Sequence, residues 1–319
     1  MRVTLLATEG MFDTGLAVLL DTLSTANDLS SESDQQPPFR VEIAGVRDRV
    51  VSQQGMQIPI VPADDVTPPE LVLVPALGEK TPDALAEALR RDDLRDAAAR
   101  IVTWADSGAR VAAACTGTYL LASTGLLDGM RATTTWWLGA DFRRRFPSVE
   151  LDDTKMVVDA DGRVTAGAAL AHVDLALWFV REHSPTLARI TSRHLLVDGR
   201  PSQAAYAMLD HVAHRDPIVE KFERWARHNL CDFTMASAAR AVGASERTLE
   251  RRLRKVLGQT PIAFVRALRV EKAMFLLETT DESVERIAEA VGYGDGVTLR
   301  TLLREKTGLG IRQLRRRVH

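Results

Sequence analysis

The sequence predicts two domains: a mixed α/β domain with a mostly parallel sheet, followed by an all-α domain. Three observations carry this prediction. Short apolar runs alternate with helical patterns from the N-terminus to about residue 183. No strand pattern follows Pro217, and the charge changes sign between the two parts. A chain of 319 residues is long enough for two domains, each with its own core.

The elements of the first domain follow from hydrophobic periodicity and turn residues. We expect strands at Val3–Ala7, Arg40–Val46, Leu71–Pro75, Arg110–Ala114 and Arg163–Ala166. We expect helices at Gly15–Asn27, Asp83–Ser107, Gly117–Thr124 and Ala169–His183. Strands that alternate with helices form βαβ units, so the sheet should be parallel and covered on both faces. The almost continuous apolar runs at 71–74 and 111–114 are typical of buried central strands.

The boundary between the domains lies where this pattern weakens, around Ser184–Asp216. Pro185, Gly199-Arg200-Pro201 and Asp216-Pro217 interrupt the segment. We therefore predict a first domain at 1–190, a connection at 191–216 and a second domain at 217–319. Helical patterns in the second domain occupy approximately 217–230, 234–242, 245–257, 261–278, 283–291 and 296–306.

Charge separates the two parts of the chain. Residues 220–319 contain 20 Lys and Arg against 13 Asp and Glu, a net charge of +7, whereas residues 1–219 carry −9. A basic domain joined to an acidic one indicates an anionic partner for the second domain only.

Several classes of protein are not indicated. No apolar run approaches the length of a membrane span, and the N-terminal stretch resembles a strand more than a signal peptide. Cys115 and Cys231 form no metal-binding pattern, so we expect free thiols and neither a metal nor a cofactor. The expected location is the cytoplasm.

The first helix-turn-helix pattern spans Met235–Leu249. Small residues in its first helix allow close packing, Gly243 suits a left-handed turn, and Ser245 is a good N-cap for the second helix. Leu249, Leu253 and either Val256 or Leu257 should face the core, so the basic face stays outward. We expect Arg247 and Arg251 to read bases, since arginine matches guanine bidentately. The expected DNA-contacting residues are Ser245, Glu246, Arg247, Arg251, Arg252 and Lys255, the last two for phosphate.

The second helix-turn-helix pattern spans Ser283–Arg300, with Gly292 at its turn. Ile287, Ala288 and Val291 should form the inner face. The expected DNA-contacting residues of its second helix are Thr298, Arg300, Thr301 and Arg304. Gly296 is a poor helix former, so we expect this helix to read sequence less sharply than the first. Arginines at 312 and 315–317 add charge for phosphate contacts.

Residues 217–318 resemble the AraC/XylS-type DNA-binding domain, in which a long helix joins two helix-turn-helix units. The matching residues include Val242-Gly243, Ser245–Leu249, Gly258–Pro261, Leu268–Ala273, Ile287-Ala288, Val291–Asp295 and Lys306–Gly308. The resemblance implies that double-stranded DNA is the partner and that the two reading helices enter successive major grooves, about 34 Å apart. Gly310-Ile311 departs from the Ser-Pro that is usual in the family.

Cys115 follows the apolar strand Arg110–Ala114 and precedes a helix. A cysteine at such a sharp turn lies near the positive end of the helix, which favours its thiolate. The other interpretation is a cysteine that only packs in the core.

Residues 1–183 resemble the amidotransferase-like family that includes PfpI-type peptidases and isonitrile hydratases, which implies a flavodoxin-like fold. The matching residues are Ala113–Gly117, Leu120–Ala122, Gly125–Gly129, Ala132–Thr134 and Asp174–Leu177. Peptidases of the family carry His directly after the cysteine, where this chain has Thr116, and related members have His where it has Thr135. We therefore expect no catalytic residue, and we interpret His172 as structural.

A ligand pocket is the remaining interpretation of this domain. Its expected lining is Asp13, Gly78, Cys115, Thr116 and Trp136. Most of these residues follow strands, and parallel sheets bind ligands at the carboxyl ends of their strands. Asp13 either hydrogen-bonds a ligand or caps the next helix.

Three hypotheses follow from these patterns. The first is a DNA-binding regulator controlled by a small-molecule effector or by oxidation of Cys115. The second is a cysteine-dependent hydratase or amidase with an accessory DNA-binding domain. The third is a scaffold whose first domain only pairs two DNA-binding domains. Domains of this resemblance commonly self-associate, so a homodimer is expected under each.

Overall fold

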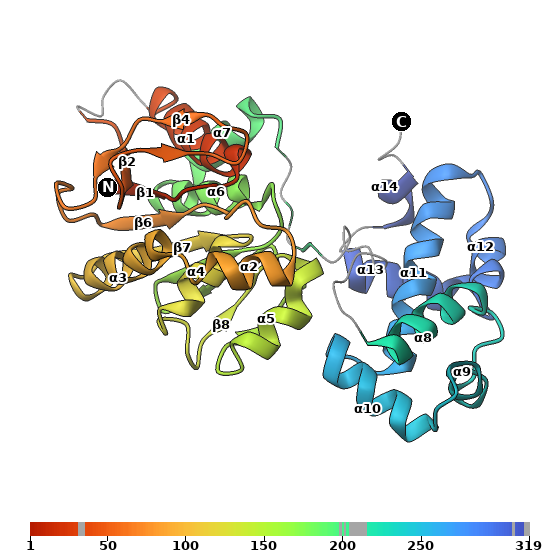
Figure 1. Ribbon diagram of the computed structural model, residues 1–319. Helices are drawn as coiled ribbons and strands as arrows, with labels where there is room; N and C mark the ends of the chain where they lie inside the picture. The colour runs from red at the N-terminus through yellow and green to blue at the C-terminus, as the bar shows by residue number, and fades with distance from the viewer. Residues whose placement is uncertain (31–35, 198–199, 201, 204–215, 308–309, 316–319) are drawn as a thin grey trace. The chain divides into compact units, whose positions relative to one another are not determined.

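The computed structural model describes the chain except residues 31–35, 198–199, 201, 204–215, 308–309 and 316–319. The chain divides into two compact units, Met1–Gln203 and Ala204–His319, whose folds Figure 1 shows. This division falls inside the connection predicted at 191–216. The first unit nevertheless extends further than 190, because a helix continues to His194 and Gln203 is buried within the unit.

A seven-stranded sheet forms the centre of the first unit. Its order is β10-β11-β7-β6-β1-β2-β5, and all neighbours are parallel except β10 and β11. The strands are β1 Arg2–Ala7, β2 Arg40–Gly45, β5 Val61–Pro62, β6 Leu71–Val74, β7 Arg110–Ala114, β10 Val157–Ala160 and β11 Arg163–Ala166. All four residues of β6 are buried, as the sequence predicted for a central strand. The mostly parallel flavodoxin-like sheet is confirmed.

Helices cover both faces of this sheet. They are α1 Asp13–Asp28, α2 Pro82–Ala88, α3 Asp92–Asp106, α4 Gly117–Ser123, α5 Gly139–Arg145, α6 Ala171–His183 and α7 Pro185–His194, with a 3-10 turn at Trp136–Leu138. Helices α1, α6 and α7 pack on one face against alternate strand residues such as Val3, Leu5 and Leu73, while α3 and α4 lie on the other (Figure 1).

Two short ladders complete the unit. Strands β3 Val50–Val51 and β4 Gln57–Ile58 are antiparallel, and β8 Arg131–Ala132 and β9 Glu150–Leu151 are parallel.

The single helix predicted at Asp83–Ser107 is wrong, because the structure has two helices there. Helix α2 ends at Ala88, and α3 begins at Asp92. Asp92 and Asp93 lie in the first turn of α3, where the helix dipole favours negative charge. The Arg91 guanidinium binds Asp93 (2.9 Å) and Glu79 (3.1 Å), which fixes the bend between the helices.

In the described residues of the second unit, all regular secondary structure is helical. They are α8 Pro217–His228, α9 Met235–Val242, α10 Glu246–Leu257, α11 Pro261–Thr279, α12 Val284–Ala290, α13 Gly296–Thr307 and α14 Ile311–Arg315. All six predicted helices are present. In the described part of the chain, no helix is long and apolar enough to cross a membrane.

Gly117 controls how closely α4 approaches the sheet. A Cβ at this position would lie closer to the carbonyl oxygens of Val74 and Pro75 than van der Waals contact allows. Gly125, in contrast, has a φ of 80° but open space around it.

We therefore expect Gly117→Ala to lower the free energy of unfolding by about 3 kcal/mol, because backbone must move to make room. Gly125→Ala should cost about 1 kcal/mol, which reflects its left-handed conformation alone. Urea unfolding of the two variants measures the difference, and equal losses would contradict the packing argument.

Candidate functional site

Cys115 lies at a sharp turn where β7 ends and α4 begins. Its φ of 56° is in the left-handed region, which residues other than glycine rarely adopt. The Cys115 amide donates to the Ala166 carbonyl on β11 (2.9 Å), and the Thr134 hydroxyl donates to the Cys115 carbonyl (2.7 Å). The strand-to-helix turn predicted from the sequence is confirmed, and neighbouring segments hold its unusual backbone in place.

Burial favours the neutral form of the Cys115 thiol. Burial raises its pKa to about 11, and hydrogen bonds with Thr116 and Thr135 only partly offset this effect. The residue is 5% exposed, so water stabilises the thiolate very little. Desolvation therefore opposes the effect of the α4 N-terminus, which the sequence predicted to favour the thiolate.

His172 is the histidine that the sequence places in the core of this unit, and both of its ring nitrogens are bound to backbone. Nε2 accepts from the Ala76 amide (3.0 Å), and Nδ1 donates to the Ala169 carbonyl. The ring is fully buried, and burial lowers its pKa to about 4. The ring also fills the space beside Gly15, where a Cβ would lie 2.7 Å from Nε2. This arrangement supports the structural interpretation and leaves no nitrogen to accept a proton from Cys115.

Asp13 binds the loop between β3 and β4. Its carboxylate accepts hydrogen bonds from the Ser52 hydroxyl and from the Gln54 amide (3.2 Å for the latter). It is the first residue of α1, and Phe12 is the N-cap. Asp13 therefore does not cap α1, whereas a hydrogen bond from its carboxylate to a ligand stays a prediction.

Gly78 contacts the same loop. The Gln53 side-chain amide donates to its carbonyl (2.9 Å), and a Cβ would clash with the carbonyl oxygen of Gly10. Thr116 is buried and donates to the Leu77 carbonyl (2.7 Å). These contacts link the segments that follow β1, β6 and β7, at the carboxyl ends of these strands.

Trp136 is the remaining residue of the predicted pocket. It is half-buried in the 3-10 turn directly after Thr135 and packs edge-on against Trp137, with ring centroids 5.4 Å apart. The structure thus brings Asp13, Gly78, Cys115 and Thr116 to neighbouring strand ends, whereas their role in ligand binding stays a prediction.

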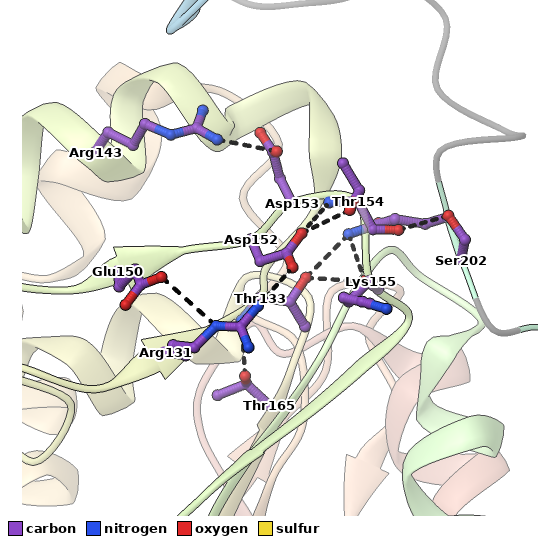
Figure 2. A network of polar contacts seen from close by, with 11 residues as sticks. Arg131, Thr133, Arg143, Glu150, Asp152, Asp153, Thr154, Lys155, Thr165 and Ser202 are labelled. Carbon is purple, nitrogen blue, oxygen red and sulfur yellow. Dashed lines mark hydrogen bonds and ion pairs between the residues drawn. The ribbon is translucent and has the colours of Figure 1, made fainter. Parts of the chain in front are cut away.

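The sequence pattern places Gln203 in the connection between the units, yet its side chain is almost completely buried. Its Nε2 donates to the Thr134 carbonyl (2.8 Å) and the Thr133 hydroxyl (3.1 Å), and its Oε1 accepts from the Ala168 amide (3.0 Å). Figure 2 shows the surrounding network, in which Ser202 binds the Thr154 carbonyl (2.7 Å). No local pattern marks Gln203, because its partners are 35 to 70 residues away in sequence.

The first helix-turn-helix, α9 and α10, forms as predicted. The Thr234 hydroxyl caps α9, Gly243 turns the chain with a φ of 71°, and Ser245 caps α10 by accepting from the Thr248 amide (3.2 Å). Leu249, Leu253 and Leu257 are buried.

The opposite face of α10 exposes Glu246, Arg247, Arg251 and Lys255. In the described residues, none of these four side chains forms a salt bridge. Arg252 is half-buried and binds Asp216, the N-cap of α8, at 2.7 Å. Its predicted phosphate contact would have to compete with this ion pair.

The second helix-turn-helix, α12 and α13, turns at Gly292 with a φ of 87°. Leu299, Leu302 and Leu303 are buried. Gly296 does not prevent helix formation, because Asp295 accepts from the amide (2.7 Å) and hydroxyl (3.0 Å) of Thr298 and so fixes the first turn.

The outer face of α13 carries Thr298, Arg300, Thr301 and Arg304, all of them exposed. Arg300 binds Glu285 of α12 (2.7 Å), and the Thr301 hydroxyl donates to the Val297 carbonyl (3.2 Å). Val297 is 68% exposed on this face, although the sequence interpretation did not include it. Arg312 is exposed and Arg315 donates to the Glu282 carbonyl, while Arg316 and Arg317 lie outside the described residues.

Comparison with known proteins assigns both units. The DJ-1/PfpI family matches residues 1–182, which is more than half of the chain. The chain belongs to the DJ-1/PfpI family. A helix-turn-helix domain of the AraC type matches residues 238–317. The combination predicted from the sequence is therefore confirmed.

Curated relatives include two regulators from Pseudomonas aeruginosa. The HTH-type transcriptional regulator CdhR is 34% identical over 185 residues, which cover 56% of this chain and 54% of that protein. The HTH-type transcriptional regulator ArgR is 31% identical over 198 residues, 60% of each. The aligned region thus spans about half to three fifths of these relatives.

A solved structure of a putative transcriptional regulator from Vibrio parahaemolyticus has the same fold as part of the chain. Its TM-score is 0.52 at 17% identity, and it covers 61% of this chain and 98% of that one.

The burial of His172 predicts a stability that depends on pH. The unfolded chain binds a proton on this residue near pH 6.5, whereas the folded protein resists it until about pH 4. Acidification from pH 7 to pH 4 should therefore remove about 3 kcal/mol of stability through this residue. Urea unfolding followed by tryptophan fluorescence measures it, and His172→Gln should show a shallower loss. Burial also raises the pKa of Asp174 to about 6, but this residue is present in both proteins and contributes equally to both pH profiles. A pH profile of His172→Gln parallel to that of the wild type would contradict the assignment.

The two cysteines should react with thiol reagents at very different rates. Cys231 is exposed, whereas Cys115 is buried with a raised pKa, so Cys115 should react on the order of 100-fold more slowly at pH 7. Iodoacetamide labelling followed by mass spectrometry tests this expectation. Cys231→Ser should remove the fast phase and Cys115→Ala the slow one; rapid labelling of Cys115 would show that the thiol is accessible and ionised.

Proposed function

We propose that this protein is a sequence-specific DNA-binding transcriptional regulator whose first unit responds to a small molecule. The observation that carries the proposal is the pair of helix-turn-helix units. Helices α10 and α13 each rest on their own core behind a glycine turn and expose polar and basic residues. Such helices place their N-terminal residues against base edges in the major groove.

Double-stranded DNA is the partner that fits this surface. Arginines 247 and 251 lie one turn apart on α10 and are exposed. Arginine binds the O6 and N7 atoms of guanine bidentately, so these two side chains are the proposed base readers of α10. Lys255 lies further along the same face and is the proposed phosphate contact. The net charge of +7 in this part of the chain supports association with a polyanion.

A small-molecule effector is favoured over oxidation as the signal at the first unit. Oxidation proceeds through the thiolate, which is scarce when the pKa of Cys115 is about 11. The proposed effector pocket is the edge of the sheet that carries Asp13, Gly78, Cys115, Thr116 and Trp136. We further propose that the regulator acts as a homodimer in the cytoplasm.

We do not propose an enzymatic function for the first unit. A cysteine hydrolase needs a base within hydrogen-bond reach of the thiol. The protonated thiol and the fully occupied His172 ring do not supply that arrangement. Turnover of an amide or isonitrile that disappears in Cys115→Ala would overturn this part.

Selection of bound fragments from genomic DNA by the full-length protein tests the function. We expect one preferred sequence with two half-sites, where a half-site is the stretch of base pairs read by one helix-turn-helix unit of a chain. Its affinity should fall steeply with salt. No preferred sequence, together with an affinity that is flat between low and moderate salt, would refute the proposal.

Two substitutions on α10 should then behave differently. Arg251→Ala should weaken binding about tenfold and relax specificity at one base pair, since one bidentate contact is lost. Lys255→Ala should weaken binding to all sequences alike and reduce the salt slope by about one. Fluorescence anisotropy on the selected site and its single-base variants measures both. Identical profiles for the two variants would contradict the assigned roles.

A further inference from the structure

Helix α11 belongs to two separate hydrophobic cores. Phe264, Val265 and Leu268 pack in the core of the first helix-turn-helix, together with residues of α8, α9 and α10. From Val270 onward, the buried residues of the same helix pack in the core formed with α12, α13 and α14. Arg269 lies between the two groups, at the middle of the helix.

Arg269 connects the two helix-turn-helix units by direct contacts. Its Nε and Nη2 atoms donate to the Leu230 carbonyl (3.0 and 2.5 Å), which belongs to the loop between α8 and α9. Its guanidinium also lies over the ring of Tyr293, 5.3 Å from the centroid, in the turn between α12 and α13.

The two loops are in close contact at this point. A Cβ on Gly292 would lie 2.8 Å from the Cys231 Cα, 2.9 Å from the Leu230 carbonyl and 3.1 Å from the Arg269 guanidinium. The Cys231 sulfur also lies 3.5 Å from the Ala290 carbonyl. The turn glycine of the second unit thus permits both a left-handed turn and close packing against the first unit. We name this contact of Arg269, Leu230, Cys231, Gly292 and Tyr293 the seam.

We propose that Arg269 is a positioning residue that fixes the separation and rotation of α10 relative to α13, and thereby the spacing of the two half-sites that the protein accepts. This inference rests on the proposed function. Two rigidly connected reading helices bind as one bivalent ligand, and the gain from bivalency is lost when the geometry no longer matches the DNA. Arginine suits the seam because its planar fork donates two hydrogen bonds that converge on one carbonyl oxygen, while its face stacks on an aromatic ring.

A direct phosphate contact is the competing role for Arg269. The geometry opposes it, because Nε and Nη2 are both bound to Leu230 and the face of the guanidinium covers Tyr293. The two roles differ in what they predict for a single half-site: a phosphate contact matters there, whereas a spacing residue does not.

The test measures binding of the full-length protein to the selected operator, to operators with one or two base pairs inserted between the half-sites, and to an isolated half-site. Each inserted pair moves the half-sites apart and rotates them, so the wild type should bind the insertions much more weakly. Arg269→Ala should bind the natural spacing about tenfold more weakly, discriminate less between spacings, and bind the half-site within about twofold of wild type. Arg269→Lys keeps the charge but not the fork, and it should change the spacing profile in the same direction.

The matched control is Arg266→Ala. Arg266 lies one turn earlier on α11 and forms an exposed ion pair with Glu305 (3.1 Å), which should contribute little. This variant should keep the wild-type spacing profile. The inference is overturned if Arg269→Ala leaves the spacing profile unchanged, or if it weakens half-site binding and lowers the salt slope by about one.

A second measurement needs no DNA. Spin labels at Lys255→Cys and Arg304→Cys, in a background with Cys115→Ala and Cys231→Ser, report the distance between α10 and α13. Arg269→Ala and Arg269→Lys should broaden its distribution, while Arg266→Ala should not. A distribution unchanged by both Arg269 variants would refute the positioning role. Failure of the wild type to bind any DNA would instead refute the proposed function. The measured distances would then still test whether Arg269 fixes the position of α10 relative to α13.

Discussion

The second unit depends on one helix being buried twice. The first half of helix α11 packs in the core of the first helix-turn-helix, and its second half packs in the core of the second. Its start is fixed by the Thr260 cap and by Pro261, both of which favour a helix N-terminus. Because each core also carries one reading helix, the geometry of the DNA-binding surface is determined largely by what happens along α11 and at the seam.

In the first unit, burial has the opposite chemical consequence from the one that the turn at Cys115 suggests. Cys115 has a left-handed backbone conformation at a sharp turn between a central strand and a helix, and this is the backbone geometry in which nucleophilic residues are often found. Reactivity, however, requires stabilisation of the thiolate, and the same packing that holds the turn excludes the water that would provide it. His172 is subject to the same effect, because burial lowers its pKa and favours the neutral ring. The ring can be buried since its two nitrogens form hydrogen bonds with the Ala76 amide and the Ala169 carbonyl.

Local signals in the sequence predicted much of this structure. Glycines with positive φ at 243 and 292, hydroxyl caps at Ser245 and leucines at helical spacing are all properties of neighbouring residues, so they specify the helix-turn-helix units without knowledge of the rest of the chain. Contacts between distant residues were not predictable in this way. The ion pair of Arg252 with Asp216 and the buried side chain of Gln203 both depend on partners that no pattern in the surrounding sequence identifies.

Gln203 also shows how the chain leaves the first unit. The Cys115 carbonyl accepts from the Thr134 hydroxyl, and the Thr134 carbonyl in turn accepts from the Gln203 amide, so two hydrogen bonds separate the turn at Cys115 from the last residue of the unit. A Cβ at Gly167 would overlap the Gln203 side chain, which means that the neighbouring backbone is shaped around it. Withdrawing this amide would leave the buried Thr134 carbonyl and the Ala168 amide without their Gln203 partner, at a cost of about 1–3 kcal/mol for each unsatisfied group. A conformational change that passes along the chain to the second unit must therefore either leave Gln203 in place or compensate for the loss of these hydrogen bonds. If Gln203 moves, the residues beside Cys115 are among those that lose contacts.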